Sequence, residues 1–197
     1  FVNSVRKLNI GPGNLPSTDV CPLVNAESLR KVNEFVRVGR NEDRAEMICG
    51  GGRFFAGDCK NGYFYEPTVF VNVTPEMHIS QQEVLGPVVC IMRARNEAEA
   101  IQICNSSRYG LVASVFTSSK TRASKVANLL DVGLINVNHP TIYVEHEIPF
   151  GGWKDSGKKL LLAAANGNVG KKMKARDIQN DFSDSLRGRG LPVGVAN

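Results

Sequence analysis

Glu83 is the charged residue whose neighbours in the sequence most favour a binding role. It precedes the Gly86-Pro87 pair and the apolar run 88–92, which has the composition and length of a buried strand. The Gly-Pro corner leaves the chain little freedom, and a carboxylate held there can accept hydrogen bonds from two vicinal hydroxyls, such as those of a nucleotide ribose. Glu83 is therefore a candidate nucleotide-binding residue. A solvated glutamate beside a strand is the alternative interpretation.

The cysteines and histidines offer no catalytic or metal-binding pattern. The five cysteines are odd in number and form no Cys-x-x-Cys pair, and the three histidines lack the spacing of metal ligands. His146, between Glu145 and Glu147, is a candidate ligand contact, with an exposed loop histidine as the alternative. We predict no metal site and no catalytic residue in this chain, and we interpret as reduced, inert thiols Cys21, Cys49, Cys59, Cys90 and Cys104.

Three consecutive glycines, Gly50 to Gly52, invite comparison with a phosphate-binding loop. The Lys-Ser/Thr pair that such loops require does not follow them, and Arg53-Phe54-Phe55 does not resemble the start of a helix. We therefore predict a turn.

Strand and helix patterns alternate between residues 25 and 138. A helix is expected from Asn25 to a stop at Gly39, a second is capped by Asn96 with Glu99 in the reciprocal position, and a third runs from Ser119 to a stop at Gly133. Strands are expected at 47–49, 69–73, 88–92, 111–116 and 134–138. This order predicts an α/β fold with a mostly parallel sheet and flanking helices. Reactive groups then collect at the carboxyl ends of strands, which directs attention to the loop 139–152.

Length and charge limit the remaining possibilities. The chain of 197 residues suffices for one sizeable α/β core, or for one domain plus an appendage. It has neither an apolar run long enough to span a membrane nor a secretory leader, so we expect a cytoplasmic protein with no membrane partner. A first residue other than Met leaves open that the chain is a piece of a longer one. Residues 1–153 carry 15 basic and 15 acidic side chains, whereas residues 154–197 carry nine and four. Nucleic-acid binding by this basic end is possible in principle, but a solvated, poorly ordered tail is the preferred interpretation, and no nucleic acid is expected as a partner.

Four motifs, in this order and spacing, resemble those of the aldehyde dehydrogenase superfamily downstream of its catalytic cysteine. The family's Gly-Tyr-Phe-x-x-Pro-Thr is matched from Gly62 to Thr68, and its Glu-Glu-Ile/Val-Phe-Gly-Pro-Val is matched in part from Gln82 to Val88. Its Asn-x-x-x-Tyr-Gly-Leu is matched from Asn105 to Leu111, and its Pro-Phe-Gly-Gly-x-Lys-x-Ser-Gly from Pro149 to Gly157. The resemblance covers residues 1–157, and residues 158–197 form a divergent basic tail.

The resemblance implies roles for individual residues. Glu83 resembles the carboxylate that holds the nicotinamide ribose, and Leu85 stands where most members have the Phe that packs near the nicotinamide. Phe150 resembles the aromatic residue that lines the aldehyde channel. The loop between Asn138 and Phe150 resembles the one that selects the far end of the substrate, and in it Val144 occupies part of a Gly-Ala position that some semialdehyde-oxidising members use.

The function implied by the resemblance is the oxidation of an aldehyde, or of a semialdehyde, to a carboxylic acid with NAD or NADP. The family's nucleophilic Cys, oxyanion-binding Asn, general-base Glu and nucleotide-binding half all lie upstream of the matched region, so we expect the isolated chain to be inactive. The full-length parent is expected to be a homo-oligomer. The alternative is a truncated, non-catalytic homologue that serves as a subunit-interaction module.

Overall fold

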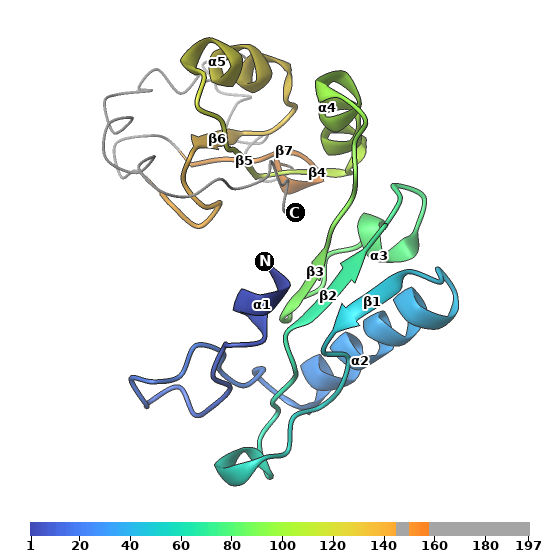
Figure 1. Ribbon diagram of the computed structural model, residues 1–197, viewed down its shortest axis with the longest axis vertical. Coiled ribbons are helices and arrows are strands. Elements are labelled where there is room, and N and C mark those ends of the chain that lie inside the picture. The colour runs from blue at the N-terminus through green and yellow to red at the C-terminus, as the bar shows by residue number, and fades with distance from the viewer. Residues whose placement is uncertain (145–149, 158–197) are drawn as a thin grey trace. The chain divides into compact units, whose positions relative to one another are not determined.

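The computed structural model describes residues 1–144 and 150–157. These residues form two compact units, one from Phe1 to Arg93 and one that begins at Ala94 (Figure 1). Each unit contains strands and helices around its own apolar core. The predicted aldehyde-dehydrogenase-like portion 1–157 includes residues of both units, and the predicted tail 158–197 lies outside the described residues.

The first unit is built on a three-stranded sheet in the order β1-β2-β3. Strand β1 (Glu46–Cys49) runs antiparallel to β2 (Thr68–Val71), which runs parallel to β3 (Val88–Cys90). The helix α2 (Ala26–Asn41) runs along this sheet (Figure 1). Val32 and Val36 of α2 share a buried cluster with Phe70 of β2, whose side chain is 0% exposed. Shorter elements complete the unit: α1 (Val2–Val5), the 3-10 turn η1 (Gly57–Cys59) and α3 (His78–Gln81).

The start of α2 is confirmed, but the predicted stop at Gly39 is wrong. Asn25 caps the helix, since its Oδ1 accepts a hydrogen bond from the backbone N–H of Ser28 at 2.8 Å. The helix continues through Gly39 to Asn41. A Cβ atom at Gly39 would lie 2.7 Å from Cγ2 of Ile79, so the glycine serves the close packing of α2 on α3.

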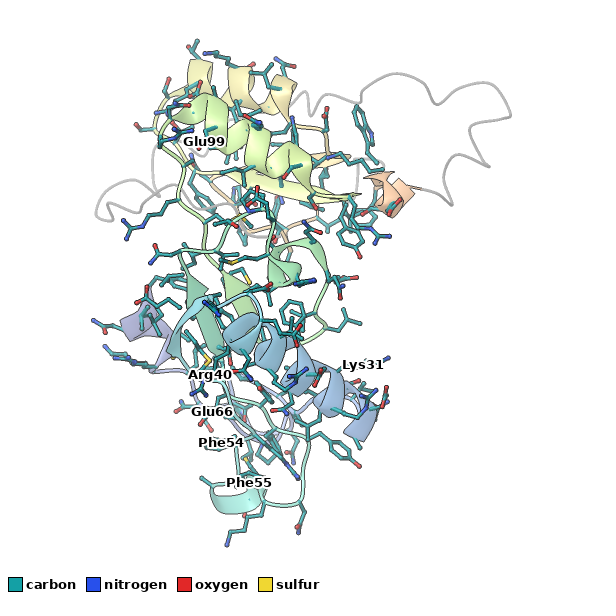
Figure 2. The ribbon with its side chains drawn as sticks, turned by 90° about the vertical axis from the view of Figure 1, so that its right-hand side faces the viewer. Lys31, Arg40, Phe54, Phe55, Glu66 and Glu99 are labelled. Carbon is teal, nitrogen blue, oxygen red and sulfur yellow. The ribbon has the colours of Figure 1, made fainter. Side chains whose placement is uncertain are left out.

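The glycines after β1 form a turn, as predicted. Gly50 and Gly51 have φ angles of 71° and 104°, which side-chain-bearing residues rarely adopt. The N–H of Gly51 donates to the buried Oγ1 of Thr68 at 2.9 Å, which ties the turn to β2. The chain then enters an arm that leads to η1 and carries Phe54 and Phe55 (Figure 2).

The second unit contains a parallel pair of strands, β5 (Val112–Val115) and β6 (Leu134–Val137). A second, antiparallel pair consists of β4 (Tyr109–Gly110) and β7 (Trp153–Lys154), followed by the 3-10 turn η2 (Asp155–Gly157). The helices are α4 (Glu97–Ser106) and α5 (Lys120–Leu129). The buried core is made of Cys104, Ala113, Val115, Leu130 and Val132.

Both predicted helix caps of this unit are confirmed. Oδ1 of Asn96 accepts from the N–H of Glu99 at 2.9 Å, and Oγ of Ser119 accepts from the N–H of Arg122 at 3.2 Å. The reciprocal bond differs, because the Glu99 carboxylate reaches the N–H and the guanidinium of Arg95.

The predicted helix stop at Gly133 is wrong, since α5 ends at Leu129. A Cβ atom at Gly133 would lie 1.8 Å from the carbonyl oxygen of Gly151. The glycine therefore allows two backbone segments, distant in the sequence, to lie against each other.

The predicted α/β class is confirmed. Of the strand pairings in residues 1–144 and 150–157, two are parallel and two antiparallel. The helices of these residues are all too short or too polar to cross a lipid bilayer.

Candidate functional site

Glu83 lies in the connection between α3 and β3, with its side chain exposed to solvent. Within the described residues, neither a hydrogen bond nor an ion pair engages its carboxylate. Leu85, two residues later, is 77% exposed. The pair thus presents a carboxylate and an apolar side chain on the same short segment. Such a pair suits a ligand that carries hydroxyl groups next to a flat ring.

The segment that carries this pair is held from its carboxyl side. The carbonyl of Pro87 accepts a hydrogen bond from the N–H of Thr68 at 2.8 Å, and β3 pairs with β2 directly afterwards. A Cβ atom at Gly86 would lie 2.5 Å from Cγ2 of Val32, so the corner packs closely against α2. The motifs 62–68 and 82–88 are therefore in direct contact.

Asp43 holds the same segment from its amino side. Its carboxylate, with a side chain 4% exposed, accepts hydrogen bonds from the N–H groups of His78 and Ile79, both at 3.0 Å, and lies 2.8 Å from Nδ1 of His78. Burial alone would raise the pKa of Asp43, but the hydrogen bonds from Ile79 and His78 outweigh it and hold the pKa below its ordinary value. This anchor was not predicted, because no local pattern links Asp43 to a helix that begins 35 residues later.

The predicted substrate-pocket residues lie in the second unit. Val144 and Phe150 are 44% and 52% exposed. Residues 145–149 separate them, and the candidate His146 falls within this stretch, outside the described residues. The loop leaves β6 at Asn138, whose φ is 58° and whose amide exchanges hydrogen bonds of 2.9 and 3.1 Å with the backbone of Thr117. Glu83 and Leu85 thus belong to one unit, and Val144 and Phe150 to the other.

The two motifs of the second unit are also joined. Nζ of Lys154 donates to the carbonyl oxygens of Asn105 and Ser107, at 2.8 and 2.9 Å, at the carboxyl end of α4. The Arg108 guanidinium pairs with the Asp155 carboxylate at 2.8 Å. Lys154 therefore acts as a helix cap, a role that its place in the motif did not reveal.

The environment of two thiols, the partly buried Cys90 and the buried Cys104, agrees with the inert role predicted for them. Burial, with a further contribution from the Asp43 carboxylate, raises the pKa of Cys90 to about 11. Burial likewise raises the pKa of Cys104. A nucleophilic cysteine requires the opposite change, a lowered pKa that produces thiolate near neutral pH. Among residues 1–144 and 150–157, no three His, Cys, Asp or Glu side chains gather into a group that could hold a metal ion.

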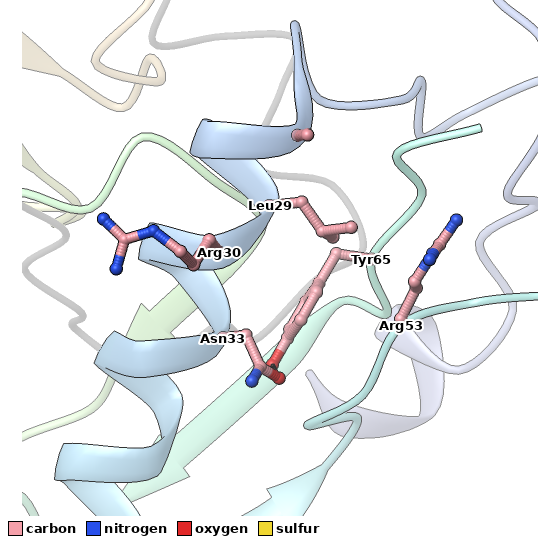
Figure 3. Close-up of a pocket in the computed structure, with 6 residues that line it drawn as sticks. Leu29, Arg30, Asn33, Arg53 and Tyr65 are labelled. Atoms are coloured by element: carbon pink, nitrogen blue, oxygen red, sulfur yellow. Dashed lines mark hydrogen bonds between the residues drawn. The ribbon is translucent and has the colours of Figure 1, made fainter.

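Two cavities of the first unit are lined by residues other than Glu83. One, of about 290 Å³, lies beside the first turns of α2, where Leu29 and Asn33 extend toward Tyr65 while Arg30 leaves the helix on the other side (Figure 3). Another, of about 560 Å³, is lined by residues of α1, β1 and the segment before β2, among them Val5, Cys49 and Glu66. Neither brings together groups suited to catalysis.

Comparison with known proteins finds that the chain is similar to aldehyde dehydrogenases. Residues 1–166 match the sequence model of the aldehyde dehydrogenase family. An aldehyde dehydrogenase of Monascus ruber is 40% identical over 156 residues, which are 78% of this chain and 30% of that protein. An alpha-ketoglutarate semialdehyde dehydrogenase of Haloferax volcanii is 34% identical over 159 residues, 81% of this chain and 32% of that protein.

Solved structures give the same result. A point mutant of betaine aldehyde dehydrogenase from Staphylococcus aureus, in complex with NAD+, has a TM-score of 0.76 at 36% identity, covering 79% of this chain and 31% of that one. The Mycobacterium tuberculosis aldehyde dehydrogenase complexed with NAD+ has a TM-score of 0.74 at 35% identity, with the same coverage. The chain spans about a third of the length of the relatives it matches.

Proposed function

Because this chain belongs to the aldehyde dehydrogenase family, we propose that it forms the part of an NAD(P)-dependent aldehyde dehydrogenase that follows the nucleophilic cysteine. In this proposal the full-length enzyme oxidises an aldehyde to a carboxylic acid. The observation that carries the cofactor part is the Glu83 carboxylate, exposed and without a partner among the described residues, beside the exposed Leu85. The NAD+ held by both structural relatives supports a nicotinamide cofactor.

The described residues fit such a cofactor. The two oxygens of Glu83 can accept hydrogen bonds from the two hydroxyls of a ribose, and Leu85 can cover one face of an adjoining apolar ring. The nicotinamide would supply the hydride acceptor. The Gly86-Pro87 corner and the Asp43 anchor hold the backbone on the two sides of Glu83, so little backbone entropy is lost when a ligand binds.

Val144 and Phe150 line the aldehyde channel in this proposal. Both are apolar and exposed, which suits contact with the non-reacting part of an aldehyde. A semialdehyde as substrate is supported by the name of the Haloferax volcanii relative and is a narrower form of the same proposal.

The proposed function is tested by following NADH or NADPH formation with a panel of aldehydes, using the full-length gene product. We expect turnover, and Glu83→Gln should raise the KM for the cofactor by about tenfold, because one charged acceptor of two hydroxyl hydrogen bonds is lost. The neighbouring exposed Gln82→Ala is the matched control and should leave this KM unchanged. An unchanged cofactor KM in Glu83→Gln would remove Glu83 from the cofactor site.

The isolated 197-residue chain is expected to show no turnover. The raised pKa of the Cys90 and Cys104 thiols supports this, because neither is prepared for attack on an aldehyde. The intact mass of the natural gene product distinguishes the two hypotheses, a full-length enzyme and a truncated subunit-interaction module. A product no larger than this chain would favour the module. Size-exclusion chromatography with light scattering on the same product tests the predicted homo-oligomer.

A further inference from the structure

Asn136 is one of the few buried polar residues of the described chain, and it lies in the middle of β6 with 9% of its surface exposed. A buried amide costs free energy unless its hydrogen-bonding groups are satisfied. The partners of Asn136 therefore indicate what the residue does.

Both N–H groups of the Asn136 amide point to one loop. Nδ2 donates to the carbonyl oxygen of Pro140 at 2.9 Å and to that of Tyr143 at 3.0 Å. A primary amide has two N–H groups, so its donor capacity is fully used. The same stretch forms a tight turn, in which the N–H of Tyr143 donates to Pro140 at 3.1 Å, and the rings of His139 and Tyr143 stack with centroids 4.6 Å apart.

This arrangement turns the loop's polar backbone inward and its apolar side chains outward. Ile142 is 86% exposed, and Tyr143 and Val144 are each 44% exposed. Burial of these side chains would be favourable, so the exposed arrangement requires a hold on the backbone. Asn136 provides that hold.

We propose that Asn136 is a positioning residue that sets which aldehydes the enzyme accepts, because it fixes the backbone of residues 140–144 and with it the placement of Val144. The selectivity part of this inference rests on the proposed function. The part that concerns how Asn136 holds the loop backbone is independent of that function.

The chain offers a matched control in Ser114. Ser114 of β5 lies opposite Asn136 in the parallel pair and is also buried. Its hydroxyl has no hydrogen-bond partner among the described residues, so it makes no hydrogen bond to residues 140–144. Ser114→Ala therefore changes the same buried layer without removing a hydrogen bond to the loop.

The first test measures amide hydrogen exchange in the full 197-residue chain. Asn136→Leu keeps the branched shape and the number of heavy atoms and removes both donors, and we expect exchange at Tyr143 to become at least about tenfold faster. Asn136→Thr, with one hydroxyl donor, should give a smaller increase, and Ser114→Ala none. The amides of β5 and β6 should stay protected in every variant. Unchanged exchange at Tyr143, or an equal increase throughout the second unit, would overturn the hold.

The second test measures selectivity in the full-length enzyme. For Asn136→Leu we expect the ratio of kcat/KM for an eight-carbon aldehyde to that for acetaldehyde to change by about fivefold or more, with kcat for acetaldehyde nearly constant. An unchanged ratio beside faster exchange would overturn the role in selectivity. Absence of turnover in the unsubstituted enzyme would instead overturn the proposed function, and the exchange experiment would still decide whether Asn136 holds the loop.

Discussion

The two units hold their candidate site residues in different ways. In the first, Glu83 and Leu85 are placed by a Gly-Pro corner, a backbone hydrogen bond to Thr68 and close packing on Val32. In the second, the loop that carries Val144 is held by the side-chain amides of Asn136 and Asn138. Backbone contacts survive most substitutions, whereas an amide hold is lost with one side chain. Such a difference between the units is expected if all members of the family bind the same kind of cofactor while their substrates differ.

The largest loss of stability is expected when a methyl group is added where two backbone segments of the second unit touch. Gly133→Ala places a Cβ 1.8 Å from the carbonyl oxygen of Gly151, which cannot move without shifting the chain. We expect a loss of about 3 kcal/mol or more in unfolding free energy, measured by urea denaturation. A loss below about 1 kcal/mol would mean that the two segments separate easily.

Gly86→Ala applies the same change in the first unit, where the neighbour is a side chain. The new Cβ would lie 2.5 Å from Cγ2 of Val32, which can partly move aside. We expect a smaller loss, about 1 to 3 kcal/mol, together with a raised cofactor KM in the full-length enzyme. The control is Gly52→Ala, whose Cβ would meet only the Glu66 carboxylate at 3.4 Å and which should be nearly neutral.

Lys154→Met tests whether a side chain joins the two motifs of the second unit. It removes two charged hydrogen bonds to the end of α4 while keeping the aliphatic stem. A loss of about 2 kcal/mol is expected by urea denaturation. Lys125→Met removes an exposed ion pair with Glu97 instead and should cost about 0.5 kcal/mol or less. Equal effects of the two variants would argue against the capping role.

The smallest expected effect depends on pH and concerns the Asp43 anchor. The pKa of Asp43 is lower in the folded chain than its ordinary value of 3.8, so its stabilising contribution is present above that value and is lost as pH falls through the folded pKa. Asp43→Asn should therefore be less stable than the unsubstituted chain at pH 6, and the difference should shrink below pH 4. The measurement is urea denaturation of both chains at each pH. A difference in unfolding free energy that stays constant across this range would contradict the role of the charge.

Local signals allowed much of the fold to be predicted. The caps Asn96 and Ser119 are found where expected, because a capping side chain reaches backbone only three residues away, and α2 begins next to the predicted Asn25. The strands were predictable for a similar reason, since runs of β-branched and apolar residues identify them without knowledge of their neighbours. The full burial expected for residues 88–92 is wrong, because β3 is only partly buried. The exposure of Glu83 also agrees with its predicted binding role, which itself stays a prediction.

The family, the α/β class and the starts of α2, α4 and α5 could be inferred without a structure, since the four ordered motifs and the residues of short-range caps can be recognised along the chain. The roles of five other residues follow only from their contacts in the folded chain. These residues are Gly39, Asp43, Gly133, Asn136 and Lys154. A glycine serves as a helix stop or as a point of close contact according to what packs against it. An Asp or Lys becomes an anchor only when folding brings distant backbone within hydrogen-bonding distance. For Asn136 the partners are near in sequence, yet only the path of the turn aims both carbonyls at its amide.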